Sequence, residues 1–464
     1  MHIDQIRDDF ATLESEIAGG PIVPNVTAGE VRAYLGSRFD FKRAIPLDEV
    51  IADVEQMLRK WQVQVTHPRY FGLFNPSVTL ASVVADTMVA MFNSQLANWR
   101  TSPAANEMER HTLAWLADKF GLPEDSIATF TSGGSEANLS AVVTALTWAF
   151  PEYGEYGLRH LAGDPIIYLT GETHHGFNKI ANMAGLGRRN LHVVATDANF
   201  KMSVDDLRKR VAEDRSSGHL PFMVIGTGGT TAAAIIDPLP EIGRFCKEQG
   251  LWFHADAAYG GSAVVSPKLR PFLAGTEAAD SITCDAHKWL SVPMGCGMFF
   301  CRHRDSVAQA FRSDVTYMPA KAAGNDAFAT FDPLTHSAQW SRRFIGLKLF
   351  MALAEYGEEG YARLLEHQAR MGDVLREALT VTGWRIVNST PLPVVCFTRD
   401  GLVTSELLAQ LRERQIAWMS DAQLGGVPVI RACITSFRTT EKDIEWVVGE
   451  MNKLQAHTRQ RKTA

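Results

Sequence analysis

The chain has 464 residues, of which 46% are hydrophobic, and a formal net charge of -6 at pH 7. This length exceeds what one hydrophobic core usually supports, so we expect two or three domains. The acidic balance excludes the broad basic field needed to bind nucleic acid or an anionic membrane. A small molecule is therefore the expected ligand.

The chain begins Met1-His2-Ile3-Asp4, without the basic and then apolar order of a secretory signal. No apolar run reaches the roughly 18 residues that span a bilayer. We therefore expect a cytoplasmic protein. The six cysteines form no Cys-x-x-Cys pair, which favours reduced core residues over a disulfide framework.

The N-terminal stretch, residues 1–78, shows amphipathic helical patterns that are interrupted at Gly19-Gly20-Pro21 and at His67-Pro68. It has too few strand-like runs to form an α/β core of its own. The pattern predicts a helical arm that wraps another surface.

The middle of the chain alternates short apolar runs with helical patterns. The runs are typical of buried parallel strands and lie at 166–169, 191–194, 222–225, 251–254, 281–283 and 298–300. Helical patterns such as 204–212 and 240–249 separate several of them. This rhythm predicts a doubly wound α/β sheet.

The last part of the chain opens with a long helical pattern that runs from after Phe344 to Leu379. Candidate strands follow at 384–387, 394–397 and 429–433. We expect a smaller α+β domain here.

Lys288 directly follows a histidine in Asp285-Ala286-His287-Lys288-Trp289, just after a predicted strand. A lysine that forms an imine must be partly deprotonated, which an apolar setting and nearby cations favour. A lysine after a strand is more often merely solvated. The interpretation therefore depends on its partners.

Asp256 ends a predicted strand, where a parallel sheet presents side chains to a ligand crevice. A carboxylate there can keep a pyridine nitrogen protonated, so that the ring accepts electrons. A helix N-cap would look the same. Ala258 is small enough to let a ring lie close to the backbone.

The segment Ser132-Gly133-Gly134-Ser135-Glu136-Ala137-Asn138 follows the candidate strand 127–131 and opens a helix. Glycines let backbone N–H groups approach a phosphate, and the helix N-terminus favours an anion. A helix-capping sequence would explain the same residues. The segment lacks the lysine of a Gly-Lys-Ser triphosphate site.

His174 and His175 follow the strand predicted at 166–170, and one of them can stack on a cofactor ring. Two adjacent histidines without a third ligand do not indicate zinc, so we expect no metal. Thr230-Thr231 can supply a hydroxyl to the same edge or form a turn.

Taken in order, these segments resemble the group II pyridoxal-phosphate decarboxylases, the family of aromatic amino acid, histidine and glutamate decarboxylases. The resemblance covers most of the chain. Its motifs are His67-Pro68-Arg69-Tyr70-Phe71, Ser102-Pro103-Ala104 with Glu107 and Glu109, 133–138, Glu172-Thr173-His174, Gly229-Thr230-Thr231, Asp237-Pro238, 254–259, 285–289 and Arg342-Arg343-Phe344.

The resemblance implies the α/β fold type I of pyridoxal-phosphate-dependent transferases, with a large domain around a mostly parallel, seven-stranded-type sheet. It further implies a helical N-terminal arm, a small C-terminal α+β domain and a homodimer with the active site at its interface. The expected boundaries are 1–78 for the arm, 79–345 for the large domain and 346–464 for the small domain.

The resemblance also assigns roles to residues. Lys288 would form the imine with pyridoxal 5'-phosphate, Asp256 would pair with the pyridine nitrogen, and His174 would be the ring-stacking base. The other expected cofactor contacts are Gly134, Ser135 and His287 at the phosphate, and Thr231 and Ala258 along the ring. His174 is preferred to His175 because it follows Glu172-Thr173, as the family motif requires.

The implied activity is decarboxylation of an L-amino acid to an amine and CO2. The family places a tyrosine, the expected proton donor to Cα, on a loop after the lysine, but residues 319–341 contain none. They contain Phe328, Phe331 and His336 instead. Relatives with phenylalanine at that place couple decarboxylation to oxidation and yield an aldehyde, ammonia and peroxide, which leaves this product as the alternative. His336 or Tyr317 is a substitute donor.

Substrate contacts are less defined by the sequence. Phe74 and Trp99, with Leu73, would favour an apolar or aromatic side chain, although core or dimer packing explains them equally well. Arg431 is a candidate for the substrate carboxylate or for a structural ion pair, and the loop residues Phe331 and His336 complete the candidate set. An aminotransferase or an inactive protein on the same fold are further alternatives.

Overall fold

The computed structural model describes residues 3–312 and 332–463, with side chains described through residue 456. The chain divides into two compact units. The small unit comprises residues 1–77, 371–387 and 395–464, and the large unit comprises residues 78–370 and 388–394. The arm and the small domain expected from the sequence share one unit here, so the division into three domains stays a prediction.

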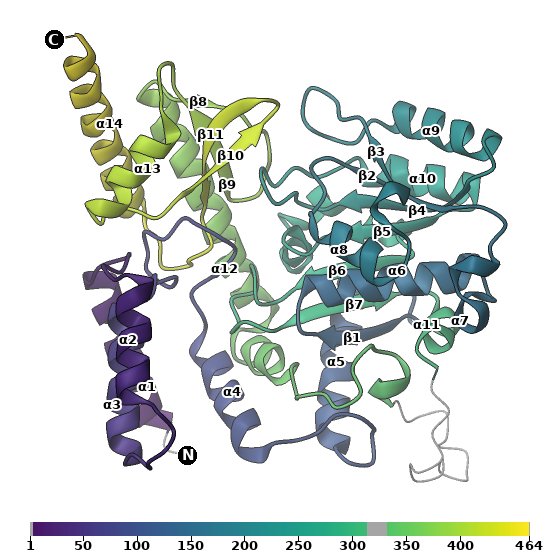
Figure 1. Cartoon of the computed structure of the whole chain (residues 1–464), viewed down its shortest axis with the longest axis horizontal. Coiled ribbons are helices and arrows are strands. Elements are labelled where there is room, and N and C mark those ends of the chain that lie inside the picture. Colours follow the sequence, from purple (N-terminus) through teal and green to yellow (C-terminus); the bar gives the residue numbers. More distant parts are fainter. Residues whose placement is uncertain (1–2, 313–331, 464) are drawn as a thin grey trace. The chain divides into compact units, whose positions relative to one another are not determined.

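The large unit is a sheet with helices around it (Figure 1). Its strands are β1 (Ile127–Thr131), β2 (Pro165–Thr170), β3 (Leu191–Val194), β4 (Leu220–Thr227), β5 (Trp252–Asp256), β6 (Ser281–Asp285) and β7 (Gly297–Cys301). Its helices are α4 (Leu80–Phe92), α5 (Pro103–Lys119), α6 (Gly134–Ala149), α7 (Tyr153–Tyr156), α8 (Gly176–Met183), α9 (Val204–Ser216), α10 (Leu239–Gln249) and α11 (Arg304–Ala310). Helix α12 (Leu347–Val381) contains the unit boundary and is interrupted at Gly357, whose φ is 62°.

The strand order in this sheet is β1-β7-β6-β5-β4-β2-β3. The strands from β3 to β6 pair in parallel, as predicted, and form a mostly parallel seven-stranded sheet. The prediction of a parallel strand at 298–300 was wrong, because β7 runs antiparallel to both β6 and β1. A parallel return needs a crossover, usually a helix, and the connection 286–296 contains none.

Helix α6 lies across the sheet (Figure 1) and is buried along most of its length. Its residues Ala137, Ala141 and Ala145 are fully buried, and these small side chains let the helix approach the strands closely. The same core contains Phe177 and Trp252. Burying a large apolar side chain contributes about 1.5–3 kcal/mol, so this contact fixes α6 firmly over the sheet.

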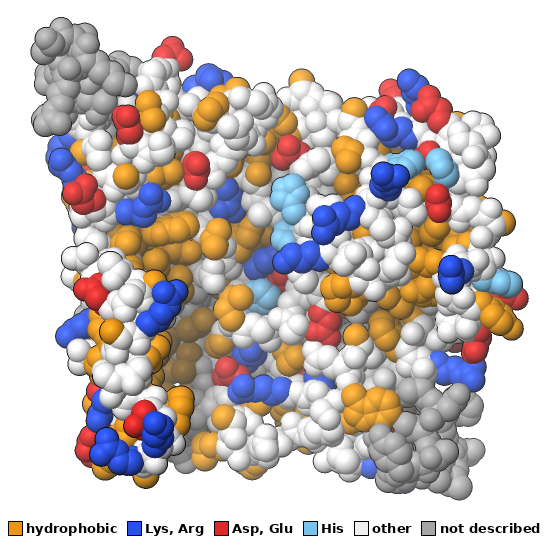
Figure 2. Space-filling view, in the orientation of Figure 1, with side chains coloured by type: hydrophobic (Ala, Val, Ile, Leu, Met, Phe, Trp, Pro, Cys, Tyr) orange, Lys and Arg blue, Asp and Glu red, His pale blue; other side chains and the backbone are white. Residues whose placement is uncertain are grey.

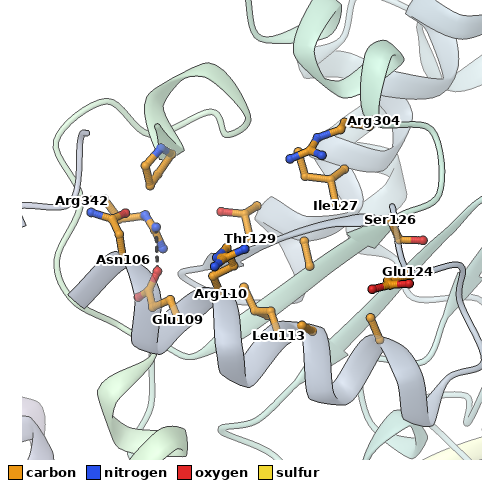
Figure 3. A pocket seen from close by; sticks show the side chains of 14 residues that line it. Asn106, Glu109, Arg110, Leu113, Glu124, Ser126, Ile127, Thr129, Arg304 and Arg342 are labelled. Carbon is orange, nitrogen blue, oxygen red and sulfur yellow. Dashed lines mark ion pairs between the residues drawn. The ribbon is translucent and has the colours of Figure 1, made fainter. Parts of the chain in front are cut away.

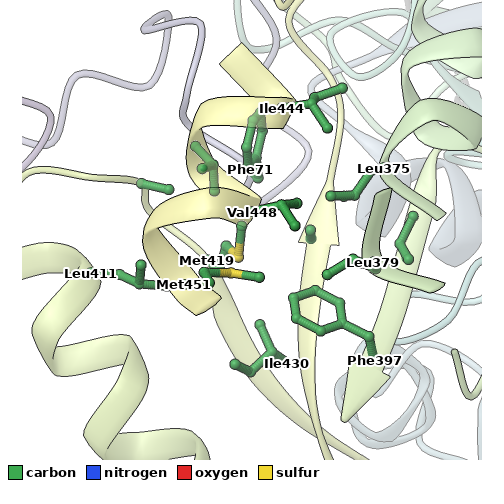
Figure 4. Close-up of a cluster of buried hydrophobic side chains, with 14 of the residues drawn as sticks. Phe71, Leu375, Leu379, Phe397, Leu411, Met419, Ile430, Ile444, Val448 and Met451 are labelled. Atoms are coloured by element: carbon green, nitrogen blue, oxygen red, sulfur yellow. The ribbon is translucent and has the colours of Figure 1, made fainter. Parts of the chain in front are cut away.

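The small unit contains a second sheet with strand order β10-β11-β9-β8. Its strands are β8 (Arg385–Ile386), β9 (Val394–Thr398), β10 (Ser420–Leu424) and β11 (Val427–Cys433). Its helices are α1 (Ile3–Gly19), α2 (Ala28–Arg38), α3 (Leu47–Lys60), α13 (Thr404–Glu413) and α14 (Glu441–Thr463). Its core is formed by apolar side chains from the end of α12 and from β9, β11, α13 and α14, together with Phe71 (Figure 4).

The predicted features of the termini and surface can be located in this structure. Helix α1 ends at Gly19, where the sequence predicted a break, and all six cysteines are buried and free, which confirms the expectation of reduced thiols. Acidic and basic side chains are interspersed on the face shown in Figure 2, without one broad field of either sign. None of the described helices is long and apolar enough to cross a membrane.

Candidate active site

The residues expected at the site follow successive strands of the large sheet and lie near its carboxyl edge. The turn 132–134 follows β1, His174 follows β2, Thr231 follows β4, Asp256 ends β5, and Lys288 follows β6. The carboxyl ends of parallel strands open onto one crevice, which is where α/β proteins bind ligands. Motifs that are separate in the sequence therefore lie along one edge of the sheet.

Lys288 forms an ion pair with a carboxylate to which the sequence analysis gave no role. Its Nζ lies 3.0 Å from Asp285 Oδ2, and the Asp285 side chain is 2% exposed. The Oδ1 atom of Asp285 is buried and has no hydrogen-bond partner among the described residues. A buried carboxylate with an unused oxygen is costly unless a further donor arrives, so this atom indicates space for one.

His287 also lies near this carboxylate. Its Nε2 lies 3.8 Å from Asp285 Oδ2, and its Nδ1 accepts a hydrogen bond of 3.1 Å from the Cys296 N–H. Burial lowers the pKa of His287 below its ordinary value. The neutral ring therefore carries its proton on Nε2, where it is available to a ligand or to Asp285.

Asp256 is 4% exposed and receives one donor on each oxygen. Asn138 Nδ2 donates to Oδ2 over 3.1 Å, and the Ala258 N–H donates to Oδ1 over 3.2 Å. A carboxylate has roughly four acceptor positions, so acceptor capacity remains for a ligand. The sequence signal for Asn138 was its place one helical turn after Gly134, which puts both residues on the same side of α6.

The glycine turn between β1 and α6 packs against the lysine motif. A Cβ added at Gly134 would lie 2.8 Å from Asp285 Oδ2 and 3.3 Å from Ala258 Cβ, and one added at Gly133 would lie 3.3 Å from His287 Cε1. A side chain at Gly134 would therefore collide with the site. Glycine is needed there because the start of α6 lies so close to the lysine motif.

His174 lies beside this turn. Its Nδ1 accepts a 3.0 Å hydrogen bond from the Gly176 N–H, and a Cβ on Gly176 would lie 2.6 Å from that Nδ1 and 3.7 Å from Ser135 Oγ. Desolvation lowers the pKa of His174, and the Asp256 carboxylate opposes this by raising it. The imidazole is therefore neutral at pH 7 and presents an uncharged ring face.

The remaining predicted contacts in the large unit have their own local partners. Thr231 is exposed after β4, whereas Thr230 is buried and accepts a 3.0 Å hydrogen bond from the Ile235 N–H. Trp99 donates from Nε1 to Glu107 over 2.9 Å. His336 is close to Thr335, with Nδ1 and Oγ1 2.6 Å apart.

Two candidate substrate residues belong to the small unit, where they meet each other. The guanidinium of Arg431 lies 4.8 Å from the ring centroid of Phe74, and its Nη1 donates to the Gly72 carbonyl over 2.8 Å. Phe331, like Phe328 and Tyr317, lies outside the described residues. The assignment of substrate contacts stays a prediction for the whole candidate set, which comprises Phe74, Trp99, Arg431, Phe331 and His336.

A separate pocket lies between α5 and β1 (Figure 3). It contains the buried ion pair between Glu109 Oε2 and Arg342 Nη2, 2.7 Å long, which joins two motifs that are far apart in the sequence. It contains none of Lys288, Asp256 and His174. In the described part of the chain, no group of three His, Cys, Asp or Glu residues is arranged to hold a metal ion.

The donor set of the lysine edge fits pyridoxal phosphate. It offers an amine on Lys288, a buried carboxylate with spare acceptor capacity on Asp256, and a neutral imidazole face on His174. The glycine turn at the start of the 16-residue helix α6 offers backbone donors and a favourable dipole to a phosphate. In chemical type these groups match the aldehyde, the ring nitrogen, the ring face and the phosphate of that cofactor.

Comparison with known proteins gives the same family. A sequence model described as the pyridoxal-dependent decarboxylase conserved domain matches residues 39–399. Tyrosine decarboxylase 2 of Arabidopsis thaliana is 28% identical over 95% of this chain and 83% of its own length. Phenylacetaldehyde synthase of the same plant is 28% identical over 96% and 92%.

Solved structures show the same fold. The structure of Oryza sativa TDC with PLP and tryptamine has a TM-score of 0.89 to this chain, with 24% identity and 97% of each chain covered. The family match extends over most of the chain and includes the lysine edge. The chain belongs to the group II pyridoxal-dependent decarboxylases and is a carboxy-lyase that uses pyridoxal phosphate.

Proposed function

We propose that the protein decarboxylates an L-amino acid to the corresponding amine and CO2. The observation that carries this proposal is the ion pair between Lys288 Nζ and Asp285 Oδ2, 3.0 Å long, at the same sheet edge as Asp256 and the start of α6. A reactive amine, an acceptor for the ring nitrogen and a phosphate site are combined there. Several relatives are named amino acid decarboxylases, which supports the same activity.

Pyridoxal phosphate, when bound, supplies a carbonyl that condenses with amines and a protonated ring that takes up the electron pair left at Cα. Lys288 provides the protein's own amine, and Asp285 stabilises that amine as an ammonium whenever it is released. Asp256 places a negative charge at the ring nitrogen. His174 would pack its neutral face on the ring, and Gly134 and Ser135 would bind the phosphate together with His287. Thr231 and Ala258 would line the ring.

The substrate in this proposal is an L-amino acid with an aromatic or apolar side chain. Relatives are named for tyrosine and tryptophan, and solved relatives are described with L-tryptophan or tryptamine. Trp99 belongs to the large unit and is partly exposed, so it is available to contact such a side chain. The contacts proposed for Phe74 and Arg431 would have to come from the small unit.

The test is a panel of L-amino acids incubated with the holoenzyme and assayed together for CO2, amine and hydrogen peroxide. Equal amounts of CO2 and amine without peroxide are expected for an aromatic substrate. Lys288→Ala should release no CO2, whereas Lys209→Ala, which removes an exposed lysine of α9, should behave like the unaltered enzyme. No CO2 from any amino acid would contradict the proposal.

A second candidate function is decarboxylation coupled to oxidation, which yields an aldehyde, ammonia and hydrogen peroxide. The observation that favours it is the absence of tyrosine from residues 319–341 of the sequence, where Phe328 and Phe331 occur instead. Two of the relatives are named aldehyde synthases. Oxygen consumption equal to CO2 release in the same panel would establish this product in place of the amine.

We further propose a homodimer with the active site at its interface. Helix α3 carries Leu47, Ile51, Val54 and Leu58 at spacings of four, three and four residues, which places them on one face of the helix. Their exposed fractions are 73%, 55%, 39% and 51%. Such an apolar stripe in water favours contact with another surface, and a second copy of the chain fits the predicted arm.

The oligomeric state tests this arrangement. Sedimentation should show a dimer, and the double variant Ile51→Glu with Leu58→Glu should shift it toward monomer, because two charges would have to be buried in the contact. Gln56→Glu adds a charge to the same helix outside the stripe and should leave the dimer intact. A monomer at micromolar concentration of the unaltered protein would contradict the proposal.

A further inference from the structure

Asp256 is connected to the interior of the sheet through a chain of buried side chains. Asn138 donates from Nδ2 to Asp256 Oδ2 over 3.1 Å, and its Oδ1 lies 3.0 Å from His254 Nε2. The exposed fractions of Asn138, Asp256 and His254 are 3%, 4% and 0%. Water does not compete for these bonds, so their geometry is set by the protein.

The chain continues beyond the histidine. His254 Nδ1 lies 2.8 Å from Ser281 Oγ, and the indole Nε1 of Trp252 lies 2.9 Å from the same oxygen. An indole N–H only donates, so Ser281 accepts from Trp252, and its own hydroxyl hydrogen remains available to His254 Nδ1. When Ser281 donates to Nδ1, the imidazole carries its proton on Nε2 and donates it to Asn138 Oδ1.

The carboxylate end of the chain sets the direction of its hydrogen bonds. An ionised Asp256 only accepts, so Asn138 must turn its NH2 group toward it and its oxygen toward His254. Burial lowers the pKa of His254 to about 4, so the ring is neutral at pH 7 and can hold this single tautomer. The carboxylate end therefore sets the orientation of every group in the chain, and a Ser281 hydroxyl that donates to His254 completes it.

We propose that Asn138, His254 and Ser281 form a directed hydrogen-bond relay that positions Asp256 for the ring nitrogen of pyridoxal phosphate. They are positioning residues, since they act on the cofactor only through Asp256. This inference rests on the proposed pairing of Asp256 with that nitrogen. The relay consists of neutral donors, so it orients the carboxylate without cancelling the charge that the nitrogen needs.

The relay holds the Asp256 carboxylate in one orientation. Asn138 occupies Oδ2 and the Ala258 N–H occupies Oδ1, which prevents rotation of the carboxylate. If Asn138 turned over, its carbonyl oxygen would face Asp256 Oδ2 and repel it. Loss of the Ser281 hydroxyl removes the donor to His254 Nδ1 and so favours that inversion, because a proton on Nδ1 then displaces no hydrogen bond.

The test compares two ligands on each apoprotein: pyridoxal phosphate and its analogue with CH in place of the ring nitrogen. Equilibrium dialysis gives the dissociation constant of each ligand. The ratio of the analogue's constant to that of pyridoxal phosphate measures only what the ring nitrogen contributes to binding. Asp256→Ala should lower this ratio most. Asn138→Ala should lower it about tenfold, as expected for a lost hydrogen bond to a charged group, and Ser281→Ala about threefold.

Matched variants separate positioning from general damage to the fold. Thr144→Val changes another fully buried polar side chain of α6 outside the relay and should leave the ratio unchanged. Ser281→Thr keeps the hydroxyl and should restore the ratio that Ser281→Ala lowers. General loosening of the site would weaken both ligands equally and leave every ratio unchanged.

The outcomes distinguish the two proposals. If Asp256→Ala leaves the ratio unchanged, the pairing of Asp256 with the nitrogen is wrong. If Asp256→Ala lowers the ratio but neither Asn138→Ala nor Ser281→Ala does, the relay is overturned while the pairing stands. Ser281→Ala removes a single oxygen, so it gives the answer even if Asn138→Ala does not fold.

Discussion

Two carboxylates of the large unit, Asp256 and Asp214, are both associated with histidines. They differ in how much of their hydrogen-bond acceptor capacity the protein itself uses. Asp214 accepts from Tyr168 Oη over 2.5 Å, from His192 Nδ1 over 2.7 Å and from His219 Nδ1 over 3.2 Å. Asp256 accepts from one amide and one backbone N–H. A carboxylate surrounded by the protein's own donors is an anchor, whereas one with capacity left over can bind a ligand.

The histidines differ in the same way. His192 and His219 contact Asp214 directly, and their side chains are 26% and 36% exposed. His254 is fully buried and is separated from Asp256 by the amide of Asn138. Inserting a neutral amide lets a histidine orient a carboxylate without adding a proton that could neutralise it. We expect the first cluster to serve stability and the second to serve chemistry.

The largest effect is expected at Lys288. Lys288→Ala removes the only amine that the proposal gives to the cofactor carbonyl, so decarboxylation should fall at least about a thousandfold. The visible absorbance of the bound cofactor should change at the same time. No substitution in the Asp214 cluster should approach this effect in a CO2-release assay. Activity within tenfold of the unaltered enzyme would remove Lys288 from its role.

Exchanging the two carboxylates tests the comparison directly. Asp256→Ala should lower kcat/KM about a hundredfold or more, because an electrostatic partner of the reacting group is lost. Asp214→Ala should leave kcat/KM within about twofold and lower the free energy of unfolding by about 1–3 kcal/mol, since buried donors lose their acceptor. Steady-state kinetics and urea unfolding measure the two effects. Similar profiles for both variants would mean that the distinction is wrong.

The sequence predicts where the chemistry-bearing residues lie because each ends or follows a strand. Apolar runs end at Asp256 and just before Lys288, and parallel topology then brings these residues to one edge. The direction of β7 was not predictable from its apolar run, because antiparallel and parallel central strands are equally apolar when buried. Strand β10 was missed because Ser420, Asp421 and Gln423 give it no apolar run at the edge of its sheet.

Asp285 and Asn138 both occur in motifs that the sequence analysis identified, but their contacts with Lys288 and Asp256 were not predicted. Both were part of motifs that matched the family, yet their contacts depend on which strands are neighbours. Asp285 becomes the partner of Lys288 only because the turn after β6 folds back by three residues. Asn138 reaches Asp256, 118 residues away, only because α6 lies across β5. Contacts of this kind are set by packing, which local sequence patterns do not encode.

The two clusters should also lose stability in different pH ranges. Burial lowers the pKa of His254 from 6.5 to about 4, so its contribution is complete above pH 6.5 and is lost as the pH falls toward 4. Burial by itself raises the pKa of Asp214, but hydrogen bonds from Tyr168, His192 and His219 bring it below 3.8. The contribution of Asp214 is therefore lost only below about that pH.

Urea unfolding of the apoprotein between pH 7.5 and 4.5 measures this difference. His254→Gln should flatten the dependence by up to about 1.4 kcal/mol for each pH unit below 6.5, since the unfolded chain no longer gains that proton. Asp214→Asn should lower stability by a similar amount at every pH in this range. A constant difference between the unaltered protein and His254→Gln across the range would contradict the assignment of a buried neutral histidine.

The smallest expected effect separates the members of the Asp214 cluster. Tyr168→Phe removes one hydroxyl donor from a carboxylate that keeps both histidines, so Asp214 stays satisfied. The free energy of unfolding should fall by only about 1 kcal/mol, and kcat/KM should not change. Tyr156→Phe, which alters a 64% exposed tyrosine, is the control and should change neither quantity. A loss of activity in Tyr168→Phe without a loss of stability would show that the Asp214 cluster affects the chemistry at the lysine edge. The contrast between an anchoring and a ligand-binding carboxylate would then no longer hold.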